Sequence, residues 1–129
     1  MMKNIVLLAV LFSISALAGA LCDEADQLYL RNDLDKAQFT KVLESCGREN
    51  ALSWDIAAET TTCLLETYHE KPKAACLSCF SSTTECARQS CKWLCLWGRT
   101  ENCHTCILEY CQEALENCTN LTKAELPSW

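Results

Sequence analysis

The stretch CFSSTTECARQSCKWLCLWGRTENCHTCILEYCQEALENC, residues 79–118, holds eight of the chain's 12 cysteines in a mirrored order. Before Gly98 these cysteines are separated by six, four and three residues, and after Gly98 by two, four and six. Residues that face each other in an antiparallel helical hairpin have a nearly constant sum of residue numbers. Pairing outward from Gly98 meets that rule and gives Cys95 with Cys103, Cys91 with Cys106, Cys86 with Cys111, and Cys79 with Cys118.

One physical objection applies to this hairpin. On an ideal helix the four cysteines of each arm spread over a wide arc, so not every pair can point straight at its partner. A break between residues 81 and 84 would relax this, and Ser82-Thr-Thr-Glu85 has the capping-box pattern of a helix start. An accidental mirror is the alternative, because twelve cysteines allow roughly ten thousand connectivities.

The N-terminal residues 1–20 are typical of a cleaved secretory signal. Lys3 precedes an apolar run from Ile5 to Leu17, and small residues follow up to Ala20. Cleavage after Ala18 or after Ala20 fits the pattern. A retained signal anchor is less favoured, because a spanning helix needs roughly 20 apolar residues. We therefore expect a secreted, extracellular protein with no membrane anchor after cleavage.

A disulfide framework is the favoured interpretation of the cysteines, which all follow residue 20 and are even in number. Zinc is the alternative, because Cys76-Leu-Ser-Cys79 and Cys103-His-Thr-Cys106 are CxxC pairs, and the second could also be a redox motif. Behind a secretory signal we favour bridges, with no metal and no cofactor. The predicted bridging residues are Cys22, Cys46, Cys63, Cys76, Cys79, Cys86, Cys91, Cys95, Cys103, Cys106, Cys111 and Cys118.

Scarce turn residues indicate an all-α fold, because the chain has only three Gly and two Pro. Periodicity and capping residues predict helices over residues 23–30, 34–46, 54–68, 86–97 and 100–118. Asp33 or Asp35 would cap the second helix and Gly47 would end it, while Ser53 would cap the third. Trp54 and Tyr68 are expected in the core.

We therefore predict a small disulfide-rich bundle of four or five short helices over residues 21–118, ending in a disulfide-braced helical hairpin. Residues 119–129 are expected to form a loosely ordered tail.

The charge pattern and the motif content exclude several functions. The net charge is −6 with no basic stripe, so nucleic acid is not an expected partner. No nucleophile elbow, zinc-protease motif or phosphate-binding glycine loop occurs, so we do not expect an enzyme. The only histidines, His69 and His104, are expected to be solvated surface residues.

Two kinds of candidate site remain. Asn117-Cys-Thr119 and Asn120-Leu-Thr122 match the N-glycosylation pattern, and Asn120 is favoured because a bridged Cys118 would compete with glycan addition at Asn117. Trp93 and Trp97 lie four residues apart in the most apolar stretch of residues 21–129. Core packing is their default interpretation, and a partner-binding patch is the alternative.

The expected function is that of a secreted binding or signalling ligand, similar to a pheromone, growth factor or toxin, which contacts an extracellular receptor or channel. The alternative is an extracellular carrier of small apolar ligands or lipids, and a thiol–disulfide redox protein is a distant third. A signalling ligand would have a filled core and surface aromatic residues. A carrier would have an apolar cavity.

The framework predicts the mass of the secreted chain. Purified from its natural source, it should weigh less than the reduced mature chain by the hydrogens of six bridges, once glycan is removed. Intact mass spectrometry before and after alkylation without reductant, and again after deglycosylation, measures both features. Alkylation of two or more thiols, or a bound metal, would contradict the framework.

Overall fold

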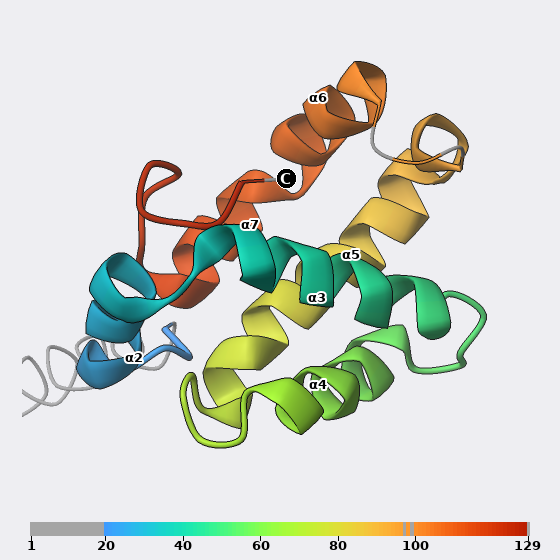
Figure 1. Ribbon diagram of the computed structural model, residues 1–129. Coiled ribbons are helices and arrows are strands. Elements are labelled where there is room, and N and C mark those ends of the chain that lie inside the picture. Colours follow the sequence, from blue (N-terminus) through green and yellow to red (C-terminus); the bar gives the residue numbers. More distant parts are fainter. Residues whose placement is uncertain (1–19, 97, 99, 129) are drawn as a thin grey trace, which may run out of the picture.

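Six α-helices and one wide π-helical turn form the part of the chain described by the computed structural model, residues 20–96, 98 and 100–128, which contains no strand (Figure 1). The all-α class and the six disulfides agree with the sequence prediction. The elements are α2 (Glu24–Leu28), η1 (Tyr29–Asp33), α3 (Lys36–Glu49), α4 (Ile56–Thr67), α5 (Ala74–Cys95), α6 (Glu101–Tyr110) and α7 (Gln112–Thr119).

Helix α5 is the central element, because it packs against α3, α4, α6 and α7. Its N-terminal half buries Leu77 and Phe80 in the main core, together with residues of α3, α4 and α7. The ring of Phe39 from α3 lies edge-on to Phe80, with ring centroids 4.8 Å apart. The core is therefore a layer of side chains between α5 and the helices that cross it.

The hairpin forms at the C-terminal half of α5, which runs beside α6. A second, smaller core of cysteines and Ile107 fills the space between the two helices. The predicted break at residues 81–84 is wrong, because α5 continues through them and the Thr83 and Thr84 hydroxyls bond the carbonyls four residues earlier. The backbone instead departs from helical geometry at Cys91, and Cys111 separates α6 from α7.

Two boundary predictions and one core prediction also need correction, whereas the predicted cap Asp35 is confirmed. Gly47 does not end α3, which continues to Glu49; Asp35 is the cap at its start. Asp55 rather than Ser53 caps α4, because the Asp55 carboxylate accepts from the Ala58 amide. Trp54 precedes that cap and is fully exposed at 106%, so it is not a core residue.

The C-terminal tail is packed rather than loosely ordered. Leu121 and Leu126 are buried in the main core, so apolar side chains after α7 hold the segment down. Arg31 forms an ion pair with Glu125, and the Thr40 hydroxyl donates to the Ser128 carbonyl at 3.1 Å. The prediction of a loosely ordered tail did not include the buried leucines or these two contacts with the first helices.

Gly47 allows α3 and α5 to approach closely. A Cβ atom at this position would lie 2.9 Å from the Thr84 methyl carbon. Replacing glycine by alanine inside a helix normally raises the free energy of unfolding by about 1 kcal/mol. Gly47→Ala should not give this increase, because the added methyl group would clash with Thr84. In a Thr84→Ser background, which lacks that methyl group, the same change should stabilise the protein.

Guanidinium unfolding with the disulfides intact measures both effects, and the single Thr84→Ser variant is the matched control. An equal effect of Gly47→Ala in the two backgrounds would contradict the close approach.

Candidate functional site

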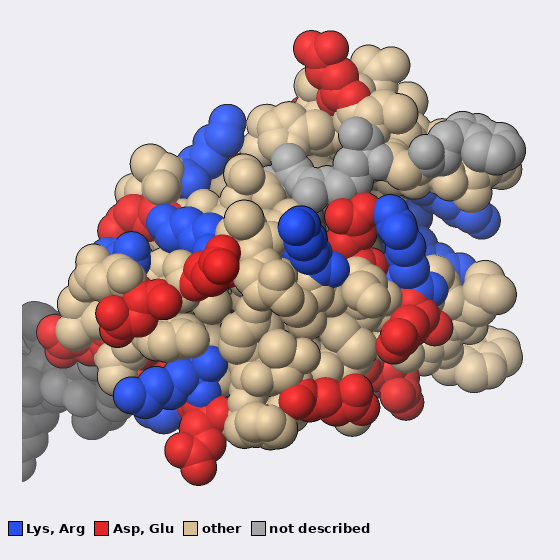
Figure 2. All heavy atoms as spheres, viewed as in Figure 1, with Lys and Arg blue, Asp and Glu red and all other residues tan. Residues whose placement is uncertain are grey.

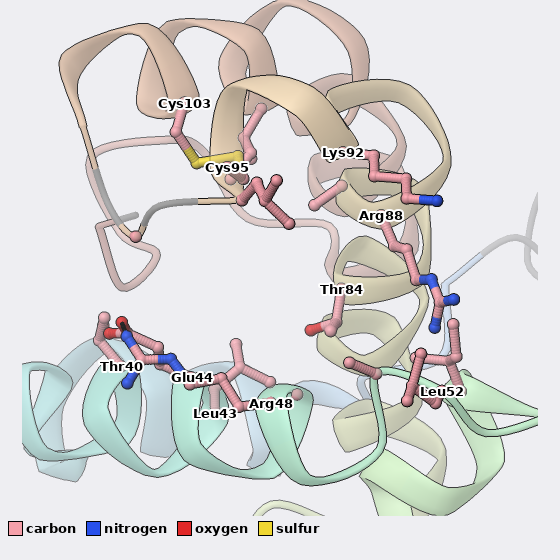
Figure 3. Close-up of a pocket in the computed structure, with 17 residues that line it drawn as sticks. Thr40, Leu43, Glu44, Arg48, Leu52, Thr84, Arg88, Lys92, Cys95 and Cys103 are labelled. Carbon is pink, nitrogen blue, oxygen red and sulfur yellow. Dashed lines mark hydrogen bonds and ion pairs between the residues drawn. A yellow bond between two sulfur atoms is a disulfide. The ribbon is translucent and has the colours of Figure 1, made fainter.

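An open apolar cleft of about 720 Å³ lies between α3 and the hairpin (Figure 3). Its size falls in the range of small-molecule sites. Figure 3 shows α3 on one side, the Cys95–Cys103 disulfide on the other, and Thr84 of α5 between them. The described lining residues come from α3, the α3–α4 loop, the first residue of α4, α5, the α5–α6 turn and α6: Thr40, Leu43, Glu44, Gly47, Arg48, Ala51, Leu52, Ile56, Thr84, Ala87, Arg88, Lys92, Cys95, Leu96, Gly98, Cys103 and Ile107.

The cleft exists because the chain has two cores rather than one. Leu43 belongs to the main core, whereas Ile107 and Cys103 belong to the small core of the hairpin. The helices α3 and α5 meet at Gly47 and Thr84, and the hairpin then extends beyond this contact. Leu52, which is 91% exposed, adds an apolar rim from the α3–α4 loop.

The charges at the cleft are mostly positive, although the whole chain carries −6. Glu44 is the one acidic residue among the described lining residues, and it forms an i,i+4 ion pair with Arg48. Arg88 and Lys92 lie one helical turn apart on α5, and Figure 3 shows both side chains on the same side. Figure 2 shows basic side chains gathered on this face where α3 approaches the hairpin.

Arg88 has an unusual environment for a cation. Its Nη1 atom is buried and has no hydrogen-bond partner among the described residues. In Figure 3 its side chain runs from α5 toward the α3–α4 loop, and the guanidinium ends above Leu52. A buried donor without a partner costs about 1–3 kcal/mol, so this group is a candidate contact for a polar part of a ligand.

The disulfides follow the mirrored pairing. Cys79–Cys118, Cys86–Cys111, Cys91–Cys106 and Cys95–Cys103 brace the hairpin, as the spacing predicted. Cys22–Cys76 and Cys46–Cys63 fasten the earlier helices. Each CxxC pair divides its cysteines between two different bridges, so neither forms a dithiol, and no cysteine is free. Within residues 20–96, 98 and 100–128, no group of His, Cys, Asp and Glu side chains could hold a metal ion.

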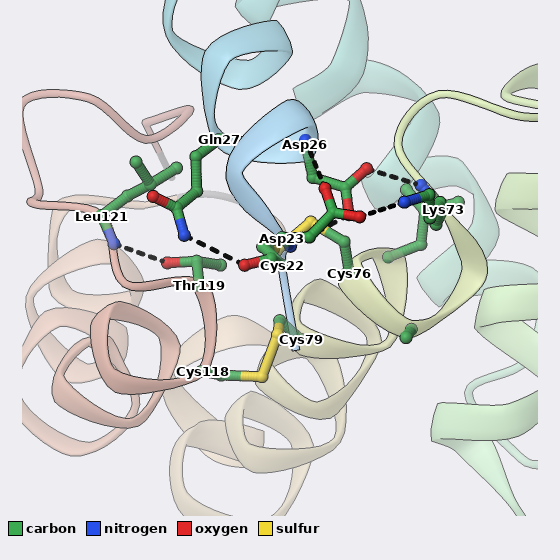
Figure 4. The surroundings of a disulfide bond; sticks show 12 residues. Cys22, Asp23, Asp26, Gln27, Lys73, Cys76, Cys79, Cys118, Thr119 and Leu121 are labelled. Carbon is green, nitrogen blue, oxygen red and sulfur yellow. Dashed lines mark hydrogen bonds and ion pairs between the residues drawn. A yellow bond between two sulfur atoms is a disulfide. The ribbon is translucent and has the colours of Figure 1, made fainter. Parts of the chain in front are cut away.

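The Cys22–Cys76 bridge lies at the opposite end of the bundle from the hairpin (Figure 4). Beside it, the Asp23 carboxylate accepts hydrogen bonds from the Lys73 ammonium and the Asp26 amide. These bonds, the one from Lys73 first, lower the pKa of Asp23, and the same pair raises the pKa of Lys73. The interaction therefore holds above the usual pKa of an aspartate and is lost as the pH falls through the lowered value.

Both sequon asparagines, Asn117 and Asn120, are exposed. Their threonines differ, because Thr119 is buried with its hydroxyl bonded to the Leu115 carbonyl, whereas Thr122 is exposed. Figure 4 shows Thr119 beside the Cys79–Cys118 bridge, where its hydroxyl also accepts from the Leu121 amide. The geometry around Asn120 is thus the more open of the two.

Trp93, one of the two candidate partner-binding residues, is 77% exposed, and Lys92 Nζ lies 5.4 Å from its ring centroid. Core packing, its default interpretation, is therefore wrong. Trp97 lies outside the described residues. Sequence reasoning did not find the cleft, because its residues come from six segments and share no motif. The sequence did contain one indication of the site, because Arg88 and Lys92 are four residues apart and would share one face of a helix.

Comparisons with protein-family models, curated proteins and solved structures give no match to this chain. Among the described helices, none is both long enough and apolar enough to cross a bilayer.

The Cys95–Cys103 bridge holds one wall of the cleft, which predicts a local effect of its removal. Cys95→Ala/Cys103→Ala should cost about 2–3 kcal/mol, since the loop it closes is short. Hydrogen exchange should become faster in residues 100–107, while α3 and α4 keep their protection.

Cys22→Ala/Cys76→Ala is the matched control, because this bridge closes a longer loop away from the cleft. It should cost more, about 4 kcal/mol, and leave hydrogen exchange in the hairpin unchanged. Unchanged exchange in the hairpin of the Cys95/Cys103 variant would show that the wall does not depend on this bridge.

Proposed function

We propose that this protein is a secreted binding protein that holds a small, largely apolar molecule in the cleft between α3 and the hairpin. The observation that carries the proposal is the cleft itself, with about 720 Å³ of space and walls of Leu43, Ile56, Leu96 and Ile107. Apolar walls with a few polar groups are the usual construction of a small-molecule site.

The disulfides support this proposal in two ways. Six bridges, together with the signal-like residues 1–20, fit a protein of an oxidising extracellular environment. Bridges also brace the walls, because Cys46–Cys63 joins α3 to α4 and Cys95–Cys103 closes the hairpin. A pre-formed site loses less conformational entropy on binding than a flexible one.

The lining chemistry favours binding over catalysis. Among the described lining residues, the only sulfur groups are those of Cys95 and Cys103, which are bridged to each other. His69 is exposed and His104 is partly buried, and neither is among the residues that line the cleft. We therefore propose a role without covalent chemistry.

A signalling ligand that acts on a receptor or channel is the second candidate function. The observation that favours it is the exposed apolar surface of Trp93, Leu94 and Leu96 near the end of the hairpin. Tryptophan is enriched at binding hot spots. Leu96 also lines the cleft, whereas Trp93 and Leu94 do not, so variants of Trp93 and Leu94 test this surface separately.

Binding of a neutral fluorescent probe tests the first proposal. N-phenyl-1-naphthylamine should bind the purified protein at one saturable site. Ala87→Phe, which fills the cleft from α5, should weaken this binding at least about tenfold, a loss of about 1.4 kcal/mol. Leu52→Glu, at the exposed rim, should weaken it without disturbing the core.

Ala75→Phe is the matched control, since Ala75 is exposed on the same helix and does not line the cleft. Far-UV circular dichroism checks that each variant folds. Absence of saturable binding, or equal affinities of the Ala87 and Ala75 variants, would refute the carrier function.

A further inference from the structure

We infer that the molecule bound in the cleft is an anionic amphiphile, whose oxyanion headgroup binds Arg88 and Lys92 while its apolar body fills the cleft. This inference rests on the proposed function and names the class of ligand. It is carried by the charges at the cleft and by the environment of the Arg88 guanidinium.

Arg88 and Lys92 form a like-charge pair on one face of α5. Residues four apart on a helix are neighbours, and two cations in this arrangement repel each other. The ion pairs between described residues do not involve either of them, and the acidic lining residue Glu44 pairs with Arg48. A bound anion would therefore meet two positive groups that no described carboxylate neutralises.

The Arg88 guanidinium is also placed for a headgroup at the edge of an apolar site. It lies between α5 and the α3–α4 loop, above Leu52, and its Nη1 donor is buried without a partner among the described residues. A guanidinium presents its donors in a planar fork that matches the oxygens of a carboxylate, sulfate or phosphate. An oxyanion at this position would satisfy the donor that the protein leaves unpaired.

The apolar side chains of the cleft do not match a purely ionic ligand. Leu43, Leu52, Ile56, Leu96 and Ile107 line it, and these side chains offer no hydrogen bonds. A small inorganic anion would leave this apolar surface in water, whereas an amphiphile covers it. The combination of two cations and an apolar wall therefore fits a molecule with both properties.

Competition against bound N-phenyl-1-naphthylamine tests the inference. Dodecanoate, dodecyl sulfate, dodecanol and dodecylamine share one apolar chain and differ in the headgroup. Used below their micelle-forming concentrations, the two anions should displace the probe at about tenfold lower concentration than dodecanol, and dodecylamine should be the weakest. The anion advantage should shrink as salt is added.

Arg88→Gln should remove most of the advantage of dodecanoate over dodecanol, and Lys92→Gln should reduce it. Arg88→Lys, which keeps the charge, should retain part of it. Lys71→Gln is the control, because Lys71 is exposed and does not line the cleft. A purely structural role of Arg88 would change the affinities for acid and alcohol equally, and that result would overturn the inference.

The two proposals fail in distinguishable ways. If the neutral probe does not bind at all, the carrier function fails and the inference with it. If the probe and dodecanol bind as well as dodecanoate, in both the wild type and Arg88→Gln, the cleft binds apolar molecules and only the anionic class is overturned. Stronger displacement by dodecylamine would also overturn that class.

Discussion

The four disulfides between α5 and the α6–α7 segment are the constraint on which the rest of the structure depends. At about 100° per residue, Cys79 and Cys86 share one face of an ideal helix, whereas Cys91 and Cys95 point roughly 150° away. A straight α5 could not direct both groups at one partner. The non-helical backbone at Cys91, with φ −123°, lies at the boundary between the two groups. Cys111 has nearly the same φ, −122°, and separates the corresponding groups of the other arm. The two helix breaks thus allow all four bridges to form between the same two arms.

These bridges also explain how the molecule can have a second core that is too small to be stable by itself. That core consists of bridged cysteines and Ile107, with Ala87 beside it. A covalent link restricts the unfolded chain and replaces apolar burial as the source of stability. The hairpin can therefore stand away from the main core and leave Trp93 and Leu96 exposed. The main core and the core of the hairpin are separate, so side chains do not fill the space between α3 and the hairpin. This space is the apolar cleft.

The disulfide pairing of the hairpin could be predicted from the sequence, because the mirrored cysteine spacing indicates which residues can face each other. The positions of the helix breaks could not, since Ser82-Thr-Thr-Glu85 is a capping signal only when the preceding turn is not helical. In this chain Thr83 and Thr84 bond back to α5 instead. A glycine at this place in the sequence is typical of a helix end, but Gly47 lies inside α3. The absence of a side chain at Gly47 allows the close contact with Thr84. The cleft is lined by six segments that come together only in the folded chain, and local sequence patterns do not predict such tertiary contacts.

The charges at the cleft are the feature that stability alone does not explain. An acidic chain of net charge −6 could place a carboxylate near Arg88 and Lys92 at little cost, yet the acidic lining residue that the structure describes, Glu44, pairs with Arg48. Like charges four apart on a helix cost about 0.2–0.5 kcal/mol, and a buried unpaired donor costs about 1–3 kcal/mol. Six disulfides add to the free energy of unfolding, so this chain tolerates such costs more easily than a small domain stabilised by its core alone. Local departures from the most stable arrangement are expected at functional sites. That expectation singles out the Arg88 edge of the cleft, because there an unpaired donor, two like charges and an apolar wall occur together.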